Sequence, residues 1–260
     1  MTLAVIAFVL GLLFGSFLNV CITRLPLHES IIRPRSHCPR CAHALAWYDN
    51  VPLVSFALLR GRCRQCSVAI SRRYPLVEFA VAVFWFACVL LFGPTIQAFR
   101  TAVLCWLLIG LFVTDIETYT LPDALTIPGV ALGFAFAAAA APAGHRLAGF
   151  APAVITACVF AGLFLAIRKL YWLWRRKEGM GLGDIKLIAL IGSFLLFSRT
   201  TVALFVAVLA ASLFSVVLVI RKKADAGQVR IPFGTFLAAG GLISAFAGSR
   251  ILDWYLRFFY

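Results

Sequence analysis

Charged residues are scarce in this chain of 260 residues. Only 13% of the residues are charged, Asp and Glu together number ten, and 63% of the residues are hydrophobic. A soluble domain is closer to one-quarter charged and one-half apolar. So few charges exclude an ordinary soluble domain, and the composition therefore predicts a protein that resides in a lipid bilayer.

Long apolar segments are frequent, and about 20 such residues cross the roughly 30 Å hydrocarbon core as a helix. Eight candidate spans lie at residues 3–22, 76–92, 101–114, 125–141, 147–167, 185–197, 202–220 and 231–247. We therefore expect an all-α polytopic membrane protein with about eight transmembrane helices. No basic residue precedes the first span and no small-residue cleavage site follows it. We expect that span to be retained, with its N-terminus outside.

Basic residues outnumber acidic ones, at 24 Lys and Arg against ten Asp and Glu. If all eight spans cross, 19 of the 24 basic residues fall in the inward loops at 23–75, 115–124, 168–186 and 221–230. This is the positive-inside bias, and it predicts contact with anionic lipid on the cytoplasmic side. Aromatic residues do not alternate with the basic ones as in a base-stacking surface, so nucleic acid is not an expected partner.

One long polar segment interrupts the apolar chain. Residues 23–75 are Arg-rich and lie between the first two spans, whereas the later loops are short. We expect three parts: a first transmembrane helix at 1–22, a small cytoplasmic subdomain at 23–75, and a transmembrane bundle at 76–260.

Four cysteines of the polar segment form two Cys-x-x-Cys pairs, Cys38 with Cys41 and Cys63 with Cys66. This spacing is typical of a four-thiolate zinc site, and a metal can supply the folding free energy that so small a segment lacks. Nearby arginines such as Arg40 are expected to favour the thiolate forms. The alternative is two pairs without metal, although disulfides are not expected in the cytoplasm. We expect His37 and His43 to be surface residues, and Cys21, Cys88, Cys105 and Cys158 to be packing residues.

Two of the few acids fall within apolar spans at the inner face. Asp115 ends the third span and Asp184 begins the sixth, each about one helical turn inside the boundary. Acids are costly at that depth, so their presence suggests function. Two close carboxylates share one proton, and such a pair can act as general base and general acid in peptide hydrolysis without a metal. Gly181 and Gly183 would allow a close backbone approach before Asp184.

Other readings of the acids stay open at this point. The same two aspartates are equally compatible with proton or ion transport, and a membrane scaffold is a further alternative. Asp123 is expected to be a helix N-cap. Glu117 is expected to be solvated, and Glu78 is either a polar contact in the bundle or part of a second site.

Several motifs of the chain occur together in one known family. They lie at residues 15–20, 24–26, 38–41, 47–53, 60–66, 70–78, 121–126 and 181–186. With Asp115, these motifs resemble the bifunctional type IV prepilin peptidases, which are Gly-x-Gly-Asp aspartyl membrane proteases.

The resemblance implies catalysis by Asp115 and Asp184 and a cysteine-rich cytoplasmic domain. It implies an inner-membrane enzyme that faces the cytoplasm, cleaves prepilins and type II secretion pseudopilins after Gly, and N-methylates the new N-terminal residue from S-adenosylmethionine. Glu117 stands where the family often has a second Asp. The sequence has no Rossmann pattern for the methyl donor, so its site is not assigned. A chain that is a peptidase alone is the remaining alternative within the family.

Overall fold

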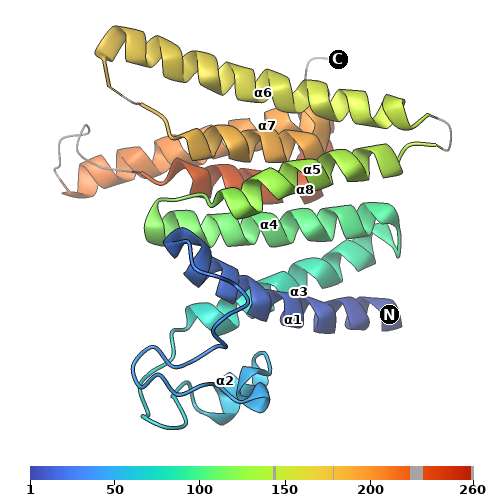
Figure 1. The fold of residues 1–260 in the computed structure, drawn as a ribbon. Coiled ribbons are helices and arrows are strands. Elements are labelled where there is room, and N and C mark those ends of the chain that lie inside the picture. Colours follow the sequence, from blue (N-terminus) through green and yellow to red (C-terminus); the bar gives the residue numbers. More distant parts are fainter. Residues whose placement is uncertain (143–144, 178, 223–230, 259–260) are drawn as a thin grey trace. The chain divides into compact units, whose positions relative to one another are not determined.

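The computed structural model describes residues 1–142, 145–177, 179–222 and 231–258, and Figure 1 shows their fold. Every regular element among these residues is a helix. The elements are α1 (Thr2–Arg24), η1 (Leu25–Leu27), η2 (Trp47–Asn50), α2 (Val54–Leu58), α3 (Arg73–Phe92), α4 (Ile96–Thr118), α5 (Asp123–Ala139), α6 (Arg146–Arg175), α7 (Leu182–Lys222) and α8 (Phe233–Leu256).

Within the described residues, six helices are long and apolar enough to cross a membrane: α1, α3, α4, α6, α7 and α8. α5 is a shorter apolar helix. α7 has 41 residues, which would extend about 60 Å if straight, twice the hydrocarbon thickness. The chain is thus a multi-pass membrane protein.

α7 is broken at Leu196, where φ is 61° and the backbone leaves the helical region. Both ends of α7 lie on the same side of the view in Figure 1, so its two halves run in opposite directions. The halves correspond to the predicted spans 185–197 and 202–220. Counting them separately, together with α5, confirms the prediction of about eight transmembrane segments.

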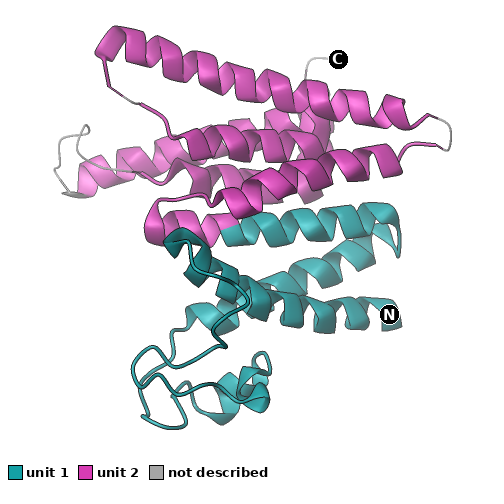
Figure 2. Cartoon of the chain, viewed as in Figure 1, with its two compact units in different colours: residues 1–110 teal, residues 111–260 magenta. Residues whose placement is uncertain are grey.

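The chain divides into two compact units, residues 1–110 and 111–260, which Figure 2 colours separately. In the first unit, α1 packs along α3. A Cβ at Gly11 would lie 2.6 Å from the Ala82 Cα, so glycine is needed at this close crossing. Because α1 and α3 pack together, the first unit includes the segment between them. The division into a first helix (1–22), a cytoplasmic subdomain (23–75) and a transmembrane bundle (76–260) stays a prediction about function.

The second unit is a helical bundle in which α7 contacts α5, α6 and α8. Gly240 of α8 allows a close approach to α7, since a Cβ there would lie 2.3 Å from the carbonyl oxygen of Ala203. The ends of α4, α6 and α7 and the starts of α5, α7 and α8 all lie on one side of this unit in Figure 1. That side carries both of the aspartates singled out by the sequence.

Candidate active site and thiol cluster

Asp115 lies in the last turn of α4 and is buried, with 5% of its surface exposed. Its Oδ2 accepts two hydrogen bonds from Thr235, one from the backbone N–H at 2.6 Å and one from the hydroxyl at 3.0 Å. Thr235 is in the first turn of α8, where backbone N–H groups have no partner within the helix. The start of α8 therefore fixes the orientation of the Asp115 carboxylate.

Asp184 lies in the first turn of α7 and is half-buried. The positive end of the helix dipole favours a carboxylate at this position. Asp184 is close enough to Asp115 for the two charges to repel each other. The structure thus brings together the two acids that the sequence singled out, although they are 69 positions apart in the chain.

Leu121 fills the space between the starts of α7 and α8. A Cβ at Gly183 would lie 3.0 Å from the Leu121 Cβ, and one at Gly234 would lie 2.9 Å from both the Leu121 Cδ1 and the Asp115 Oδ2. A Cβ at Gly181 would lie 3.4 Å from the Asp184 Oδ2. Gly183 and Gly234 therefore leave room for Leu121 and for the Asp115 carboxylate, whereas the close backbone approach expected at Gly181 and Gly183 stays a prediction.

The prediction that Asp123 caps a helix is wrong. Pro122 occupies the N-cap of α5, and Asp123 is the first residue of the helix. The Asp123 carboxylate instead pairs with the Lys186 ammonium at 2.5 Å. The Lys186 ammonium, near the start of α7, is thus the partner of the Asp123 carboxylate, in place of the backbone N–H that a helix cap would bind. Glu117 is exposed, as expected.

Sequence reasoning missed Thr235 and Gly234. The available signal was weak: a glycine followed by a hydroxyl residue begins a span that starts on the same side as the two acids. Thr235 is 120 positions from Asp115, so only the folded chain shows that they meet.

The four predicted thiol ligands cluster in the first unit. The Sγ atoms of Cys38, Cys41, Cys63 and Cys66 all lie within 4.8 Å of one another, and all are free thiols. The Cys38 and Cys66 sulfurs are 3.7 Å apart, far longer than a disulfide of about 2.05 Å. Four sulfurs at about 2.3 Å around a tetrahedral ion would be roughly 3.8 Å apart. The cluster fits a metal ion.

The two Cys-x-x-Cys segments form the same turn. The Cys38 N–H donates to the His43 carbonyl at 3.0 Å, and the Cys63 N–H donates to the Val68 carbonyl at 2.8 Å. Ala42 and Ser67, each directly after the second cysteine, have φ of 57° and 55°. This repeat of local structure was not recognised in the sequence.

Backbone amides of Cys41 and Arg40 favour the thiolate and lower the pKa of the Cys38 thiol to about 6. The cause is the turn itself rather than the arginine side chains that the sequence suggested. His37 and His43 are exposed, as predicted. Cys21, Cys88 and Cys105 are buried packing residues as expected, whereas Cys158 is exposed.

Glu78 is a buried contact between α3 and the polar segment. Its Oε2 accepts a hydrogen bond at 2.9 Å from the backbone N–H of Leu53, a residue with φ of 59°. The contact holds the strained Leu53 backbone against α3. Of the two alternatives for Glu78, a polar contact and part of a second site, the structure shows a polar contact, which is made with the polar segment.

These features define a multi-pass membrane protein with a paired-aspartate site in its helical bundle and a thiol cluster in a polar insertion. Residues 9–92 match the model of the bacterial peptidase A24 N-terminal domain, and residues 102–220 match that of the type IV leader peptidase family. No solved structure matches the chain.

The chain is also similar to proteins named prepilin leader peptidase/N-methyltransferase. It is 34% identical to that of Aeromonas salmonicida over 282 residues, which cover 96% of this chain and 93% of the relative. It is 32% identical to that of Pseudomonas aeruginosa over 96% of this chain and 92% of the relative. It is 46% identical to that of Myxococcus xanthus over 74% of this chain, a match that covers 56% of the relative's length. The chain belongs to the prepilin leader peptidase/N-methyltransferase family.

Proposed function

We propose that this chain cleaves the leader from type IV prepilins with the aspartate pair Asp115 and Asp184, and then methylates the new N-terminal amine. The observation that carries the proposal is the approach of these two carboxylates in a chain of this family. The family likeness also favours this function over the ion or proton transporter that the same acids could form.

The hydrogen bonds at Asp115 support a separate role for each acid. Both groups of Thr235 donate to the Asp115 Oδ2, and two donors stabilise the ionised form of a carboxylate. Asp115 is therefore the general base that takes a proton from water as the water oxygen attacks the scissile carbonyl carbon. Asp184 carries the shared proton and donates it to the carbonyl oxygen. When the C–N bond breaks, the proton on Asp115 passes to the leaving amine and a hydroxyl proton of the gem-diol returns to Asp184, which restores the shared proton without a metal.

The Cys38, Cys41, Cys63 and Cys66 cluster is proposed to hold a structural zinc ion. Four thiolates complete a tetrahedron and leave no open position for a substrate. Around this cluster, the described residues of 23–75 contain only short helices. A metal would therefore supply much of the folding free energy of the insertion.

The active site is proposed to face the cytoplasm from the inner membrane, with the N-terminus outside. Basic residues support this orientation, because Arg168, Lys169 and Arg175 lie toward the end of α6, on the aspartate side of the second unit. Residues 223–230, which carry part of the predicted inward charge, lie outside the described residues. The proposed partners are prepilins, pseudopilins and membrane lipid, and not nucleic acid. The functional parts remain the first helix (1–22), the cytoplasmic subdomain (23–75) and the peptidase bundle (76–260).

S-adenosylmethionine is the proposed cofactor for the second activity. When bound, it would supply a methyl group to the product amine: its S–CH3 bond would break as the N–CH3 bond forms, S-adenosylhomocysteine would leave, and the amine would lose a proton. Because a separate N-terminal domain model matches residues 9–92, the methyl transfer is proposed to use a site apart from the aspartate pair.

The test is incubation of the purified, detergent-solubilised protein with a prepilin and S-adenosylmethionine, read by intact mass. We expect loss of the leader and one added methyl group at the new N-terminus. Asp184→Asn should leave the prepilin intact. A well-folded wild-type protein that cleaves neither prepilins nor pseudopilins would contradict the proposal, and an unmethylated product would leave a peptidase alone.

A further inference from the structure

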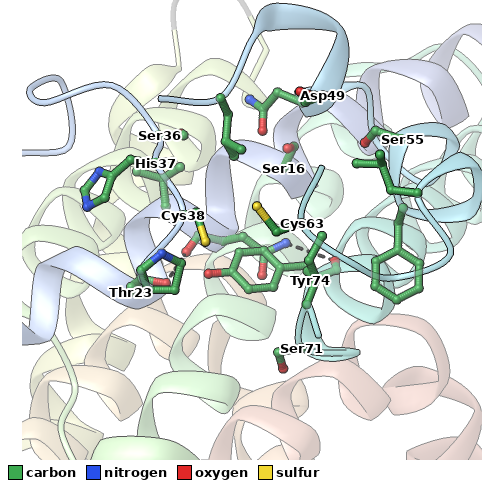
Figure 3. A pocket seen from close by; sticks show the side chains of 18 of the residues that line it. Ser16, Thr23, Ser36, His37, Cys38, Asp49, Ser55, Cys63, Ser71 and Tyr74 are labelled. Carbon is green, nitrogen blue, oxygen red and sulfur yellow. Dashed lines mark hydrogen bonds between the residues drawn. The ribbon is translucent and has the colours of Figure 1, made fainter. Parts of the chain in front are cut away.

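In the first unit, a buried arginine holds the chain that follows α1. Arg24 is 8% exposed, and its Nη1 donates to the carbonyl oxygen of Ser30 at 2.9 Å. Arg24 also lines a cavity of about 610 Å³ between α1, α3 and the polar segment. Figure 3 shows Cys38, Asp49 and Tyr74 around this space. A guanidinium on a helix can thus hold an adjoining loop through one backbone carbonyl.

The second unit has a contact of the same type shortly before Asp184. Arg168 lies about two turns before the end of α6 and is half-buried. Its Nη1 donates to the carbonyl oxygen of Met180 at 3.2 Å. Met180 lies between the end of α6 and the start of α7, outside both helices. The contact therefore links α6 to the loop that leads into the helix carrying Asp184.

The ring of Tyr171 makes a second contact between α6 and this loop. A Cβ at Gly179 would lie 2.4 Å from the Tyr171 Cδ1 and 2.9 Å from its Cγ, so the ring lies directly against the Gly179 backbone. Residues three apart lie on the same face of a helix, which places Tyr171 beside Arg168. One face of α6 thus contacts two consecutive residues of the loop, Gly179 and Met180.

The loop in turn approaches the Asp184 carboxylate. The backbone amide of Gly181 faces this carboxylate, and a Cβ at Gly181 would lie 3.4 Å from the Asp184 Oδ2. Asp115 is oriented by Thr235, whereas the donor that faces Asp184 belongs to a loop with glycines on both sides of Met180. Glycine permits many backbone conformations, so contacts from outside the loop are needed to keep the Gly181 amide in place.

We propose that Arg168 and Tyr171 are positioning residues of the peptidase, which hold residues 179–181 so that the Gly181 amide faces Asp184. Both residues act through the loop backbone. The inference rests on the proposed catalytic role of Asp184 and extends that site to one face of α6. A misplaced acid slows the chemical step, so loss of either side chain should lower kcat and leave KM nearly unchanged.

The first test compares Arg168→Met with Lys169→Met in prepilin cleavage by the full-length protein. Arg168→Met removes the donor to Met180, and we expect kcat to fall by about tenfold to a hundredfold. Arg168→Lys should restore part of the rate, because an ammonium can also donate to a carbonyl. Lys169→Met removes the same charge from the adjacent, exposed position and should cleave at the wild-type rate. An equal loss in Lys169→Met would mean that only the charge of α6 matters and would overturn the role of Arg168.

The second test examines the contact between Tyr171 and Gly179. Tyr171→Phe keeps the ring and should keep kcat, whereas Tyr171→Ala should lower it. Gly179→Ala should also lower kcat, because its Cβ would collide with the ring. Combined with Tyr171→Ala, it should cause no further loss, since the ring that it meets is gone. Fully additive losses would show that the two residues act separately and would overturn the role of Tyr171.

Thermal unfolding of each purified variant distinguishes a misplaced loop from a damaged fold. We expect Arg168→Met and Tyr171→Ala to unfold at the wild-type temperature while kcat is lowered. If both variants cleave at the wild-type kcat, or if kcat falls only in step with the unfolding temperature, the positioning role is wrong although the aspartate pair stands. If the wild-type protein itself fails to cleave prepilins, the proposed function fails, and this inference fails with it.

Discussion

Residues 111–260 carry Asp115 and Asp184 on the ends of long helices, whereas residues 1–110 carry four thiols on turns of a segment with short helices. In the second unit, Thr235 of α8 orients Asp115 at the end of α4, and the first turn of α7 carries Asp184. In the first unit, the positions depend on a cluster that fits a metal. Side chains on regular elements are held more precisely than those on loops. We therefore expect the two sites to fail in different ways.

The largest expected effect is on cleavage. Asp115→Asn or Asp184→Asn removes one half of the acid–base pair and should lower prepilin cleavage by about 10²- to 10⁴-fold or more. Gel-shift kinetics would measure the loss, with Asp253→Asn as the exposed-acid control. Methylation of a peptide that already has a free N-terminal Phe should persist in both variants. If methylation of that peptide also disappeared, the two units would not hold independent sites.

Loss of the metal should affect the first unit alone. Cys63→Ser removes one ligand, and the metal content should fall from about one ion per chain to near none. Elemental analysis would measure this, and limited proteolysis should show new cuts within the polar segment. Cys158→Ser, at an exposed thiol of α6, is the matched control. A wild-type protein without metal after preparation under reducing, chelator-free conditions would rule out the zinc site.

The next largest effect is expected from a bulkier residue beside the Asp115 carboxylate. Gly234→Ala would place a Cβ 2.9 Å from the Asp115 Oδ2, which Thr235 holds in place. The carboxylate must shift, and a displacement of this kind can lower the cleavage rate by roughly tenfold to a hundredfold. Gly162→Ala in α6 has no atom within 4 Å of its added Cβ and should be neutral. Equal rates for the two variants would mean that the position of Asp115 is not critical.

Thr235→Val removes the hydroxyl donor but keeps the backbone N–H that also binds Asp115. A hydrogen bond to a charged group contributes about 1.5–3 kcal/mol, and because the second donor remains, we expect roughly a tenfold fall in kcat. KM should change little, since Thr235 orients the base. Thr235→Ser should restore the rate. A loss that Ser fails to rescue would point to packing of the Thr methyl group instead.

The smallest expected effect concerns the pair between Asp123 and Lys186. The Lys186 side chain is 36% exposed and that of Asp123 is 59% exposed, and ion pairs near the surface contribute about 0–1 kcal/mol. Lys186→Met should therefore reduce cleavage by only a few-fold. Exchange of the two charges, in a variant with Asp123→Lys and Lys186→Asp, should recover part of the loss. A much larger effect of Lys186→Met would assign the ammonium a direct role toward the substrate.

Sequence reasoning succeeded where the signal is local or compositional. Apolar runs were sufficient to find the membrane segments, and the Cys-x-x-Cys spacing identified the thiols that the fold brings together. The depth of Asp115 and Asp184 in their spans indicated that they could meet.

The sequence did not predict the contacts between residues that are far apart in the chain. Asp123 was taken for a cap because a cap is a local rule, but its partner Lys186 is 63 positions away. Thr235 and the bond between Glu78 and Leu53 likewise depend on the packing of separate segments. The cavity of the first unit is formed by α1, α3 and the polar segment together, so no motif could reveal it.

The break at Leu196 turns α7 into two membrane crossings instead of one, and so determines on which side of the membrane the next helix begins. Because the chain reverses there, the second half of α7 returns to the side from which the first half started, and α8 begins beside Asp115. A straight α7 would deliver the start of α8 to the opposite membrane face, about 30 Å away. The Thr235 donors would then be out of reach of the carboxylate that they orient. A single residue in an unusual backbone conformation, far from the aspartates, thus decides on which side of the bilayer this part of the active site is assembled.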